Sequence, residues 1–277
     1  MKTQKLIFAL VFAAASTLMS CQRDNDPSTD NFRSAKDDAT AENMFDDVLK
    51  QASDGMLLAE DSTAGNKDMY SPLAGGCATV TIAPFDLTTF PKTITIDFGS
   101  TNCLGNDGRN RRGVIEVVTT GWYRDSGSVI SVTPINYFVD DNQVQGNKTI
   151  TNEGRNNAGN LHYGIEVNGS VTTSEGIITW TSDRDREWIE GESTIFNPWD
   201  DVYLITGTAS GTNVQGEAYT VTILTPLRIQ FGCRWIEAGS LKIESGGNEI
   251  VVDYGSGACD ATATVTINGN TYTISMM

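Results

Sequence analysis

ATVTINGNTYTI, residues Ala263 to Ile274, is the stretch that indicates the fold class. Its Asn-Gly dipeptide at residues 268–269 favours a two-residue type I′ turn between antiparallel strands. Such a turn sets Val265 opposite Tyr272 and Ala263 opposite Ile274, and it places Thr264, Thr266, Thr271 and Thr273 on the other face. The register agrees with the apolar pattern, so the sequence predicts a β-hairpin with one buried face.

Strand-forming residues dominate the chain from Cys77 onward. Runs rich in threonine, valine, isoleucine and aromatic residues are interrupted by glycine, asparagine and aspartate, which is the pattern of strands joined by turns. Residues 217–223 alternate in the same way, with Tyr219, Val221 and Ile223 on one face. We therefore predict an all-β domain over residues 77–277, either an antiparallel meander or a sandwich-like sheet.

An internal repeat divides this domain. ITIDFGSTNC, ending at Cys103, matches IVVDYGSGAC, ending at Cys259, and a Gly-Cys pair precedes each copy at the same distance. Two copies are too few for a solenoid. The repeat instead predicts two related three-strand units that flank a long central meander of residues 113–230.

The repeat also predicts a disulfide pairing. An even number of cysteines in an exported domain indicates disulfides, and four cysteines allow three pairings. In the second copy, a Gly-Gly turn at residues 246–247 places Leu241 opposite Val252, and this register brings Cys233 close to Cys259.

In the first copy the cysteines have the same spacing. A register that places Ile82 opposite Phe98 brings Cys77 to Cys103. One hairpin geometry therefore predicts both pairs.

The N-terminus has the order of a bacterial signal peptide. Lys2 and Lys5 precede an apolar stretch from Leu6 to Ala15, which is too short to span a bilayer. Residues 18–21, Leu-Met-Ser-Cys, resemble the lipobox of bacterial lipoproteins. We expect residues 1–20 to be removed and Cys21 to carry lipid, including palmitate, that holds the protein in a membrane.

A polar segment follows the lipidated cysteine. Residues 21–38 contain few apolar side chains and predict a flexible tether. Arg23, Asp24 and Asp26 are similar to the short charged signal that sends Bacteroidetes lipoproteins to the cell surface. We therefore expect an outer-membrane lipoprotein that faces outward.

One short helix is predicted at about residues 40–53. Asp38 or Thr40 can cap its start, and Gly55 can end it. Its apolar face is expected to pack on the sheet and consists of Met44, Phe45, Val48, Leu49 and Ala52. Residues 39–76 are assigned to this helix and a linker.

Four stretches carry a family resemblance. REWIEG at residues 186–191, WDDVYLITG at 199–207, GCRW at 232–235 and the hairpin that follows Cys259 resemble a family of Bacteroidetes surface lipoproteins of unassigned function. The resemblance covers nearly the whole mature chain and implies an envelope location and an all-β fold. It supplies no activity and no site residues.

Composition excludes several classes of function. The formal net charge of -16 repels phosphate backbones, so nucleic acid is not an expected partner. The chain has one histidine, His162, and no Gly-x-Ser-x-Gly elbow, so a histidine-dependent nucleophilic triad is not expected. One histidine and the absence of Cys-x-x-Cys spacing also argue against a metal site, and we expect no cofactor.

Paired acidic residues are candidates for catalysis, because glycosidases need only two carboxylates. Asp183, Asp185 and Glu187 share one strand face, and Arg184, Arg186 and Trp188 share the other. We expect a solvated charged strand, with catalysis or calcium binding as alternatives.

Other acidic groups are expected to have structural roles. The repeated Asp97 and Asp253 are expected to bond local backbone N–H groups. Residues 140–142, Asp-Asp-Asn, lack the glycine and glutamate of an EF-hand loop and predict a turn.

The tryptophans Trp122, Trp180, Trp188, Trp199 and Trp235 could stack on sugar rings. Trp180, Arg184, Arg186 and Trp188 share strand parity, and we predict that they form an exposed ligand-binding face. The expected function is a non-enzymatic binding or assembly protein for a glycan or an envelope protein. The alternatives are a carboxylate-based, glycosidase-like hydrolase and a purely structural component of an outer-membrane complex.

Overall fold

The computed structural model describes residues 32–65, 77–194, 198–233 and 235–275, and it contains one long helix and one sheet. The helix, α1, spans Arg33–Thr63, and the short 3-10 helix η3 spans Pro198–Asp200. The strands are β1 (Thr79–Ala83), β2 (Lys92–Asp97), β3 (Cys103–Leu104), β4 (Asn110–Thr119), β5 (Val129–Val139), β6 (Asn142–Arg155), β7 (Leu161–Thr173), β8 (Gly176–Glu190), β9 (Val202–Thr212), β10 (Ala218–Gln230), β11 (Ala238–Ser245), β12 (Asn248–Ser256), β13 (Thr262–Ile267) and β14 (Asn270–Ser275).

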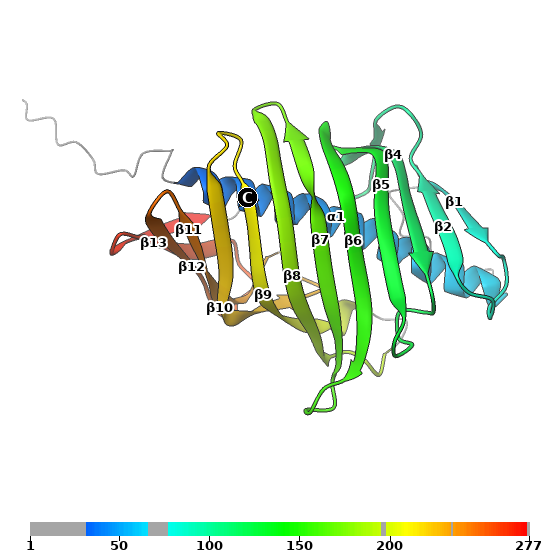
Figure 1. Ribbon diagram of the computed structural model, residues 1–277. Coiled ribbons are helices and arrows are strands. Elements are labelled where there is room, and N and C mark those ends of the chain that lie inside the picture. Colours follow the sequence, from blue (N-terminus) through cyan, green and yellow to red (C-terminus); the bar gives the residue numbers. More distant parts are fainter. Residues whose placement is uncertain (1–31, 66–76, 195–197, 234, 276–277) are drawn as a thin grey trace, which may run out of the picture.

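The sheet is an antiparallel meander of 14 strands, in which neighbours in space are almost always neighbours in sequence (Figure 1). The order runs from β1 to β14, and only β3 lies off this path, paired with β4. β1 and β14 are the two edges of the described sheet, so the sheet is open. The predicted all-β antiparallel meander is confirmed, as a single sheet.

Helix α1 crosses one face of this sheet, and we call that face the inner face (Figure 1). It contacts strands from β11 at one end to β2 at the other. Its apolar side chains recur every three or four residues, which places them in one stripe along the helix. The fully buried members of the stripe are Ala41, Phe45, Val48, Ala52 and Ala59.

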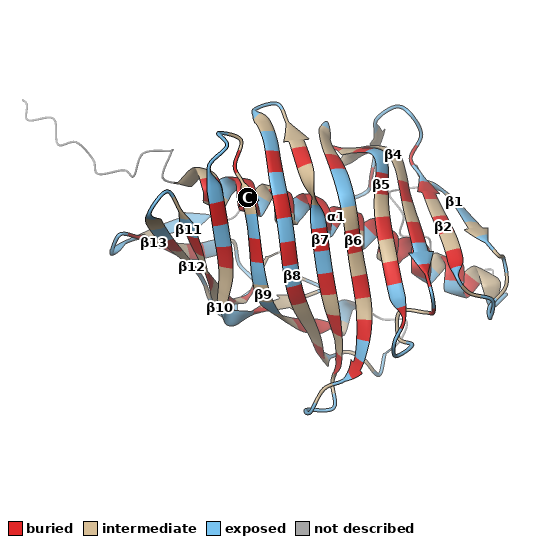
Figure 2. Cartoon of the chain, viewed as in Figure 1, coloured by how far each residue is buried: buried red, intermediate tan, exposed pale blue. Residues whose placement is uncertain are grey.

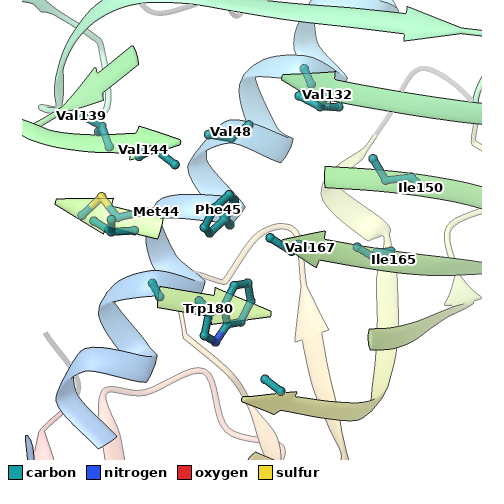
Figure 3. Close-up of a cluster of buried hydrophobic side chains, with 14 of the residues drawn as sticks. Met44, Phe45, Val48, Val132, Val139, Val144, Ile150, Ile165, Val167 and Trp180 are labelled. Carbon is teal, nitrogen blue, oxygen red and sulfur yellow. The ribbon is translucent and has the colours of Figure 1, made fainter. Parts of the chain in front are cut away.

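The core lies between this stripe and the inner face of the sheet (Figure 3). Phe45 stacks on Trp180 with ring centroids 5.6 Å apart, and valines and isoleucines of β5 to β7 surround the pair. Burial alternates along the strands, as expected for a sheet with one covered face (Figure 2). No helix in the described ranges is long and apolar enough to span a membrane.

The helix is longer than predicted at its start. Residues 33–38, assigned to a flexible tether, form its first turns because their polar side chains find partners on distant strands. Ser34 Oγ lies 2.8 Å from Ser245 Oγ, and the Asp37 carboxylate accepts a hydrogen bond from the Val214 N–H. The tether prediction is therefore wrong for these residues, and residues 21–31 lie outside the described chain.

The helix also continues beyond Gly55, which was predicted to end it. This glycine packs against Ile96 of β2, and a Cβ atom built on Gly55 would lie 2.5 Å from Ile96 Cδ1. The glycine therefore allows the helix to approach the sheet closely. A glycine that permits close packing and a glycine that ends a helix have the same sequence signature.

The repeat forms two three-strand units, and its cysteines pair as predicted. The two copies belong to β1, β2 and β4 at one end of the sheet and to β11, β12 and β13 at the other. Both disulfides form, and the two Cα atoms are 5.8 Å apart in each: Cys77–Cys103 and Cys233–Cys259. The predicted register of the second copy, with Leu241 opposite Val252, is confirmed, as is the register of the β13–β14 hairpin.

The predicted register of the first copy is wrong. Ile82 lies opposite Ile94, not Phe98. The loop between β1 and β2 fixes this register, because the Asp86 carboxylate accepts the backbone N–H groups of Thr88 and Thr89. Cys103 nevertheless reaches Cys77, because the chain turns after β2 and re-enters the sheet as β3.

Candidate functional site

The predicted ligand-binding face is buried: the helix covers Trp180 and Arg184, and the Arg124 guanidinium lies 4.8 Å from the centre of the Trp188 ring. Trp180, Arg184 and Trp188 lie on the inner face with 2% to 5% of their surface exposed, so the prediction of an exposed patch is wrong. Arg186 lies among them, with its guanidinium 3.6 Å from the centre of the Tyr203 ring. The alternation along β8 was predicted correctly, but the face that carries these four residues is the buried one.

Acidic residues of the helix approach two members of this face, Trp180 and Arg184. Glu42 lies 3.7 Å from Arg184, and Asp38 accepts a hydrogen bond of 2.8 Å from Trp180 Nε1. Lys148 donates to the Phe45 carbonyl oxygen at 3.2 Å. The sequence prediction assumed that charged strand residues face water, and it missed that an acidic helix can compensate them.

Asp47 is the centre of the most extensive of these networks. Its carboxylate pairs with the fully buried guanidinium of Arg111 and accepts the Tyr137 hydroxyl at 2.7 Å. Arg111 also pairs with Asp107 of the preceding loop. These contacts join the helix to β4 and β5, so their role is structural.

Burial changes the acid–base behaviour of this interface. It raises the pKa of Asp38 to about 6, although the Trp180 hydrogen bond and Arg184 oppose the shift. Burial likewise lowers the pKa of Lys148. Both side chains are enclosed between helix and sheet, so their shifted pKa values bear on stability rather than on a reaction with a solute.

The outer face of the sheet is open and polar. Register pairs arrange its side chains in two rows that cross five strands. The first row is Thr149, Glu166, Asp183, Thr208 and Thr222, and the second is Asn147, Asn168, Thr181, Ser210 and Thr220. The rows line a shallow hollow of about 580 Å³.

Glu166 and Asp183 lie directly opposite each other in the first row. Cβ atoms of such pairs are about 5 Å apart, and like charges there repel. Both side chains are exposed, and the residues lining the hollow include no lysine or arginine. In glycosidases, burial raises the pKa of one carboxyl group so that it can act as a general acid. Glu166 and Asp183 lie together, but neither is buried in this way.

The other predicted polar groups have local partners. His162 Nδ1 lies 2.8 Å from Asp185, which joins the histidine to the outer face of β8. Asp97 and Asp253 accept the backbone N–H groups of Gly99 and Gly255, at 2.7 and 2.8 Å, which confirms their predicted structural role. Residues 140–142 lie at the turn between β5 and β6, as predicted.

One cluster in the described chain has metal-ligand spacing: Cys233, Glu237 and Cys259. Its two sulfur atoms are bonded to each other as a disulfide. They are therefore not thiolates and offer no metal site.

The most exposed aromatic surface lies at η3 and the end of β10. Trp199 is 66% exposed and Phe231 is 41% exposed, and their rings meet edge to face with centroids 5.6 Å apart. The neighbouring Asp200 carboxylate accepts a hydrogen bond from Thr194 Oγ1. Trp199 was one of five tryptophans considered for stacking, and no sequence signal separated it from the buried ones.

Comparison with known proteins finds no match for this chain among family models, curated proteins or solved structures.

Proposed function

We propose that the protein is a lipid-anchored, non-enzymatic binding protein of the bacterial outer membrane that holds a glycan at the Trp199–Phe231 pair. The observation that carries the proposal is the exposure of this pair. An exposed indole forgoes the free energy that burial would supply, about 25 cal/mol per Å² of apolar area. Adjacent exposed aromatic side chains are typical of binding surfaces.

The chemistry of the pair favours a sugar ring. An indole face stacks on the apolar face of a pyranose, and Asp200 beside it offers carboxylate oxygens to sugar hydroxyl groups. The net charge of -16 disfavours an anionic ligand. We therefore propose a neutral, hydroxyl-rich glycan.

A glycan array followed by calorimetry tests the proposal. Trp199→Ala is expected to weaken binding of the selected neutral glycan by about 2 kcal/mol, roughly 30-fold in Kd. Phe85→Ala is the matched control, because Phe85 is equally exposed, at 64%, on the loop between β1 and β2. Equal loss in both variants, or no loss in Trp199→Ala, would contradict the proposal; binding only of an envelope protein through Trp199 would favour a protein partner.

The proposal of a lipid anchor depends on the lipobox-like residues 18–21, which lie outside the described chain. Cys21→Ser is expected to abolish palmitate labelling and to leave the precursor uncleaved at this site. Continued labelling of this variant would show that lipid is attached elsewhere. Protease added to intact cells should remove the domain if it faces outward, and full protection would place it inside the outer membrane.

A second candidate function is a carboxylate-based hydrolase, favoured only by the Glu166–Asp183 pair. The register places these two carboxylate side chains opposite each other on adjacent strands, and retaining glycosidases use two carboxyl groups about 5 Å apart. Asp183→Asn should then abolish turnover of an aryl glycoside. Equal turnover by the parent protein and the Asp183→Asn variant, or no turnover by either, would exclude the hydrolase function.

A further inference from the structure

Strand β14 forms one edge of the sheet. Its residues Asn270–Ser275 pair with β13 along their whole length, and no other strand of the described chain lies on their far side. A strand edge presents a row of backbone N–H and C=O groups that another strand can bond.

The register identifies the backbone groups that face outward. The two-residue turn of this hairpin closes on the hydrogen-bonded pair Ile267 and Asn270, and hydrogen-bonded pairs then alternate with non-bonded ones. The N–H and C=O groups of Asn270, Tyr272 and Ile274 therefore turn toward β13. Those of Thr271, Thr273 and Ser275 turn away from the sheet.

The edge lacks the features that usually protect one. β14 contains no charged residue and no proline, and its pairing with β13 is continuous. Its Ile274 is 37% exposed. At the opposite edge, Val80 and Ile82 of β1 already pack against the core.

We propose that two copies of this chain pair through β14, antiparallel, about a twofold axis at Thr273. In this register Thr273 lies opposite Thr273 of the second copy, and Thr271 lies opposite its Ser275. All three outward-facing residues of each strand are then in hydrogen-bonded pairs. Tyr272 lies opposite Ile274 of the second copy, which covers the exposed isoleucine with an aromatic ring.

Charge and sequence both favour a second copy as the occupant. Residues 271–275, TYTIS, are chemically symmetric about Thr273, with an apolar residue on each side and a hydroxyl residue beyond it. A chain with a net charge of -16 repels its own copies over most of its surface. At β14 two copies meet without placing carboxylates opposite each other.

Single-cysteine variants of the mature chain, made without residues 1–20 and with Cys21→Ala so that the introduced thiol is the only free one, test this register. Thr273→Cys is expected to form a disulfide-linked dimer under mild oxidation, because hydrogen-bonded partners have Cα atoms about 5.5 Å apart. Thr271→Cys is the matched control on the same strand. In the proposed register its two copies lie about 13 Å apart, beyond disulfide reach, so it should stay monomeric under denaturing, non-reducing conditions.

Sedimentation of the Cys21→Ala chain should show dimers, and Thr273→Lys should shift them to monomers by placing two like charges on the axis. Circular dichroism would check that this variant folds. Crosslinking through Thr271→Cys would overturn the register, and crosslinking through Thr81→Cys on β1 would move the interface to the other edge. A parent protein that remains monomeric, or that forms open-ended polymers, would overturn the proposal.

Discussion

The two faces of β8 both carry charged residues and have opposite environments. On the inner face, Trp180 and Arg184 are enclosed by the helix and have carboxylates beside them. On the outer face, Thr181 and Asp183 are exposed. The residue opposite Asp183 on the neighbouring strand β7 is a second acid, Glu166. Charge alone therefore does not identify the solvent face of a strand, because a partner element can supply the compensating charge.

Asp47→Ala should cause the largest loss of stability, because Asp47 lies in the ion-pair network of the inner face. It removes one of the two carboxylates that pair with buried Arg111 and the acceptor of the buried Tyr137 hydroxyl. Because Asp107 still pairs with Arg111, the expected loss lies toward the lower end of the about 3–5 kcal/mol that breaking a buried ion pair costs. Urea unfolding followed by tryptophan fluorescence measures this loss. Asp183→Ala on the outer face is the control, with an expected change within about 0.5 kcal/mol; a similar loss in both variants would remove the distinction between the faces.

A pH titration of stability should detect Asp38 together with Glu42, whose pKa is raised by burial to about 7. Its folded-state pKa of about 6 lies above its ordinary value of 3.8, so the folded protein binds this proton more tightly than the unfolded chain. The stabilisation is complete below pH 4 and is lost as the pH rises through 6, up to about 3 kcal/mol. Asp38→Asn keeps an acceptor for Trp180 and should reduce the slope of the curve between pH 4 and 6, while Glu42 continues to contribute as the pH rises through about 7. An unchanged slope in this variant would assign the pH dependence to Glu42 and other groups.

Gly55→Ala tests the close contact between helix and sheet. The added methyl group meets Ile96 Cδ1, and overpacking of this kind costs about 1–3 kcal/mol. Ile96→Val removes the obstructing methyl group, so the double variant should recover part of the loss relative to the sum of the single changes. Thermal unfolding of the parent, the two single variants and the double variant measures this coupling. Strict additivity of the stability changes would indicate that the two residues do not interact.

Asp183→Asn should have the smallest effect and the opposite sign. It removes the repulsion from Glu166 and is expected to stabilise the protein by about 0.2–1 kcal/mol. Because both side chains are exposed, the gain should shrink in 1 M salt. A stabilisation that does not depend on salt would point to a cause other than charge.

Local rules predicted much of the sheet. The Asn268–Gly269 and Gly246–Gly247 turns set their hairpins correctly, and equal cysteine spacing in a repeated motif led to both disulfides. The β1–β2 register was missed because its longer loop is fixed by the Asp86 side chain, which no strand pattern reveals.

The candidate site was harder to predict because exposure is a tertiary property. Trp188 and Trp199 each have an acidic neighbour in sequence, Glu187 and Asp200, yet Trp188 is buried and Trp199 is the most exposed tryptophan of the described chain. Strand parity correctly grouped Arg184 with Trp188. The acid beside Arg184, Glu42, lies on a helix more than a hundred residues earlier, beyond the reach of any local pattern.

The direction of α1 across the sheet also determines when the domain can close. Each strand can pair with the one made just before it, so most of the sheet can form as the chain emerges. The helix runs against this order, and its first turn reaches Ser245 across 211 residues of sequence. The earliest segment of the fold therefore completes its contacts only when strands near the C-terminal end of the sheet are available.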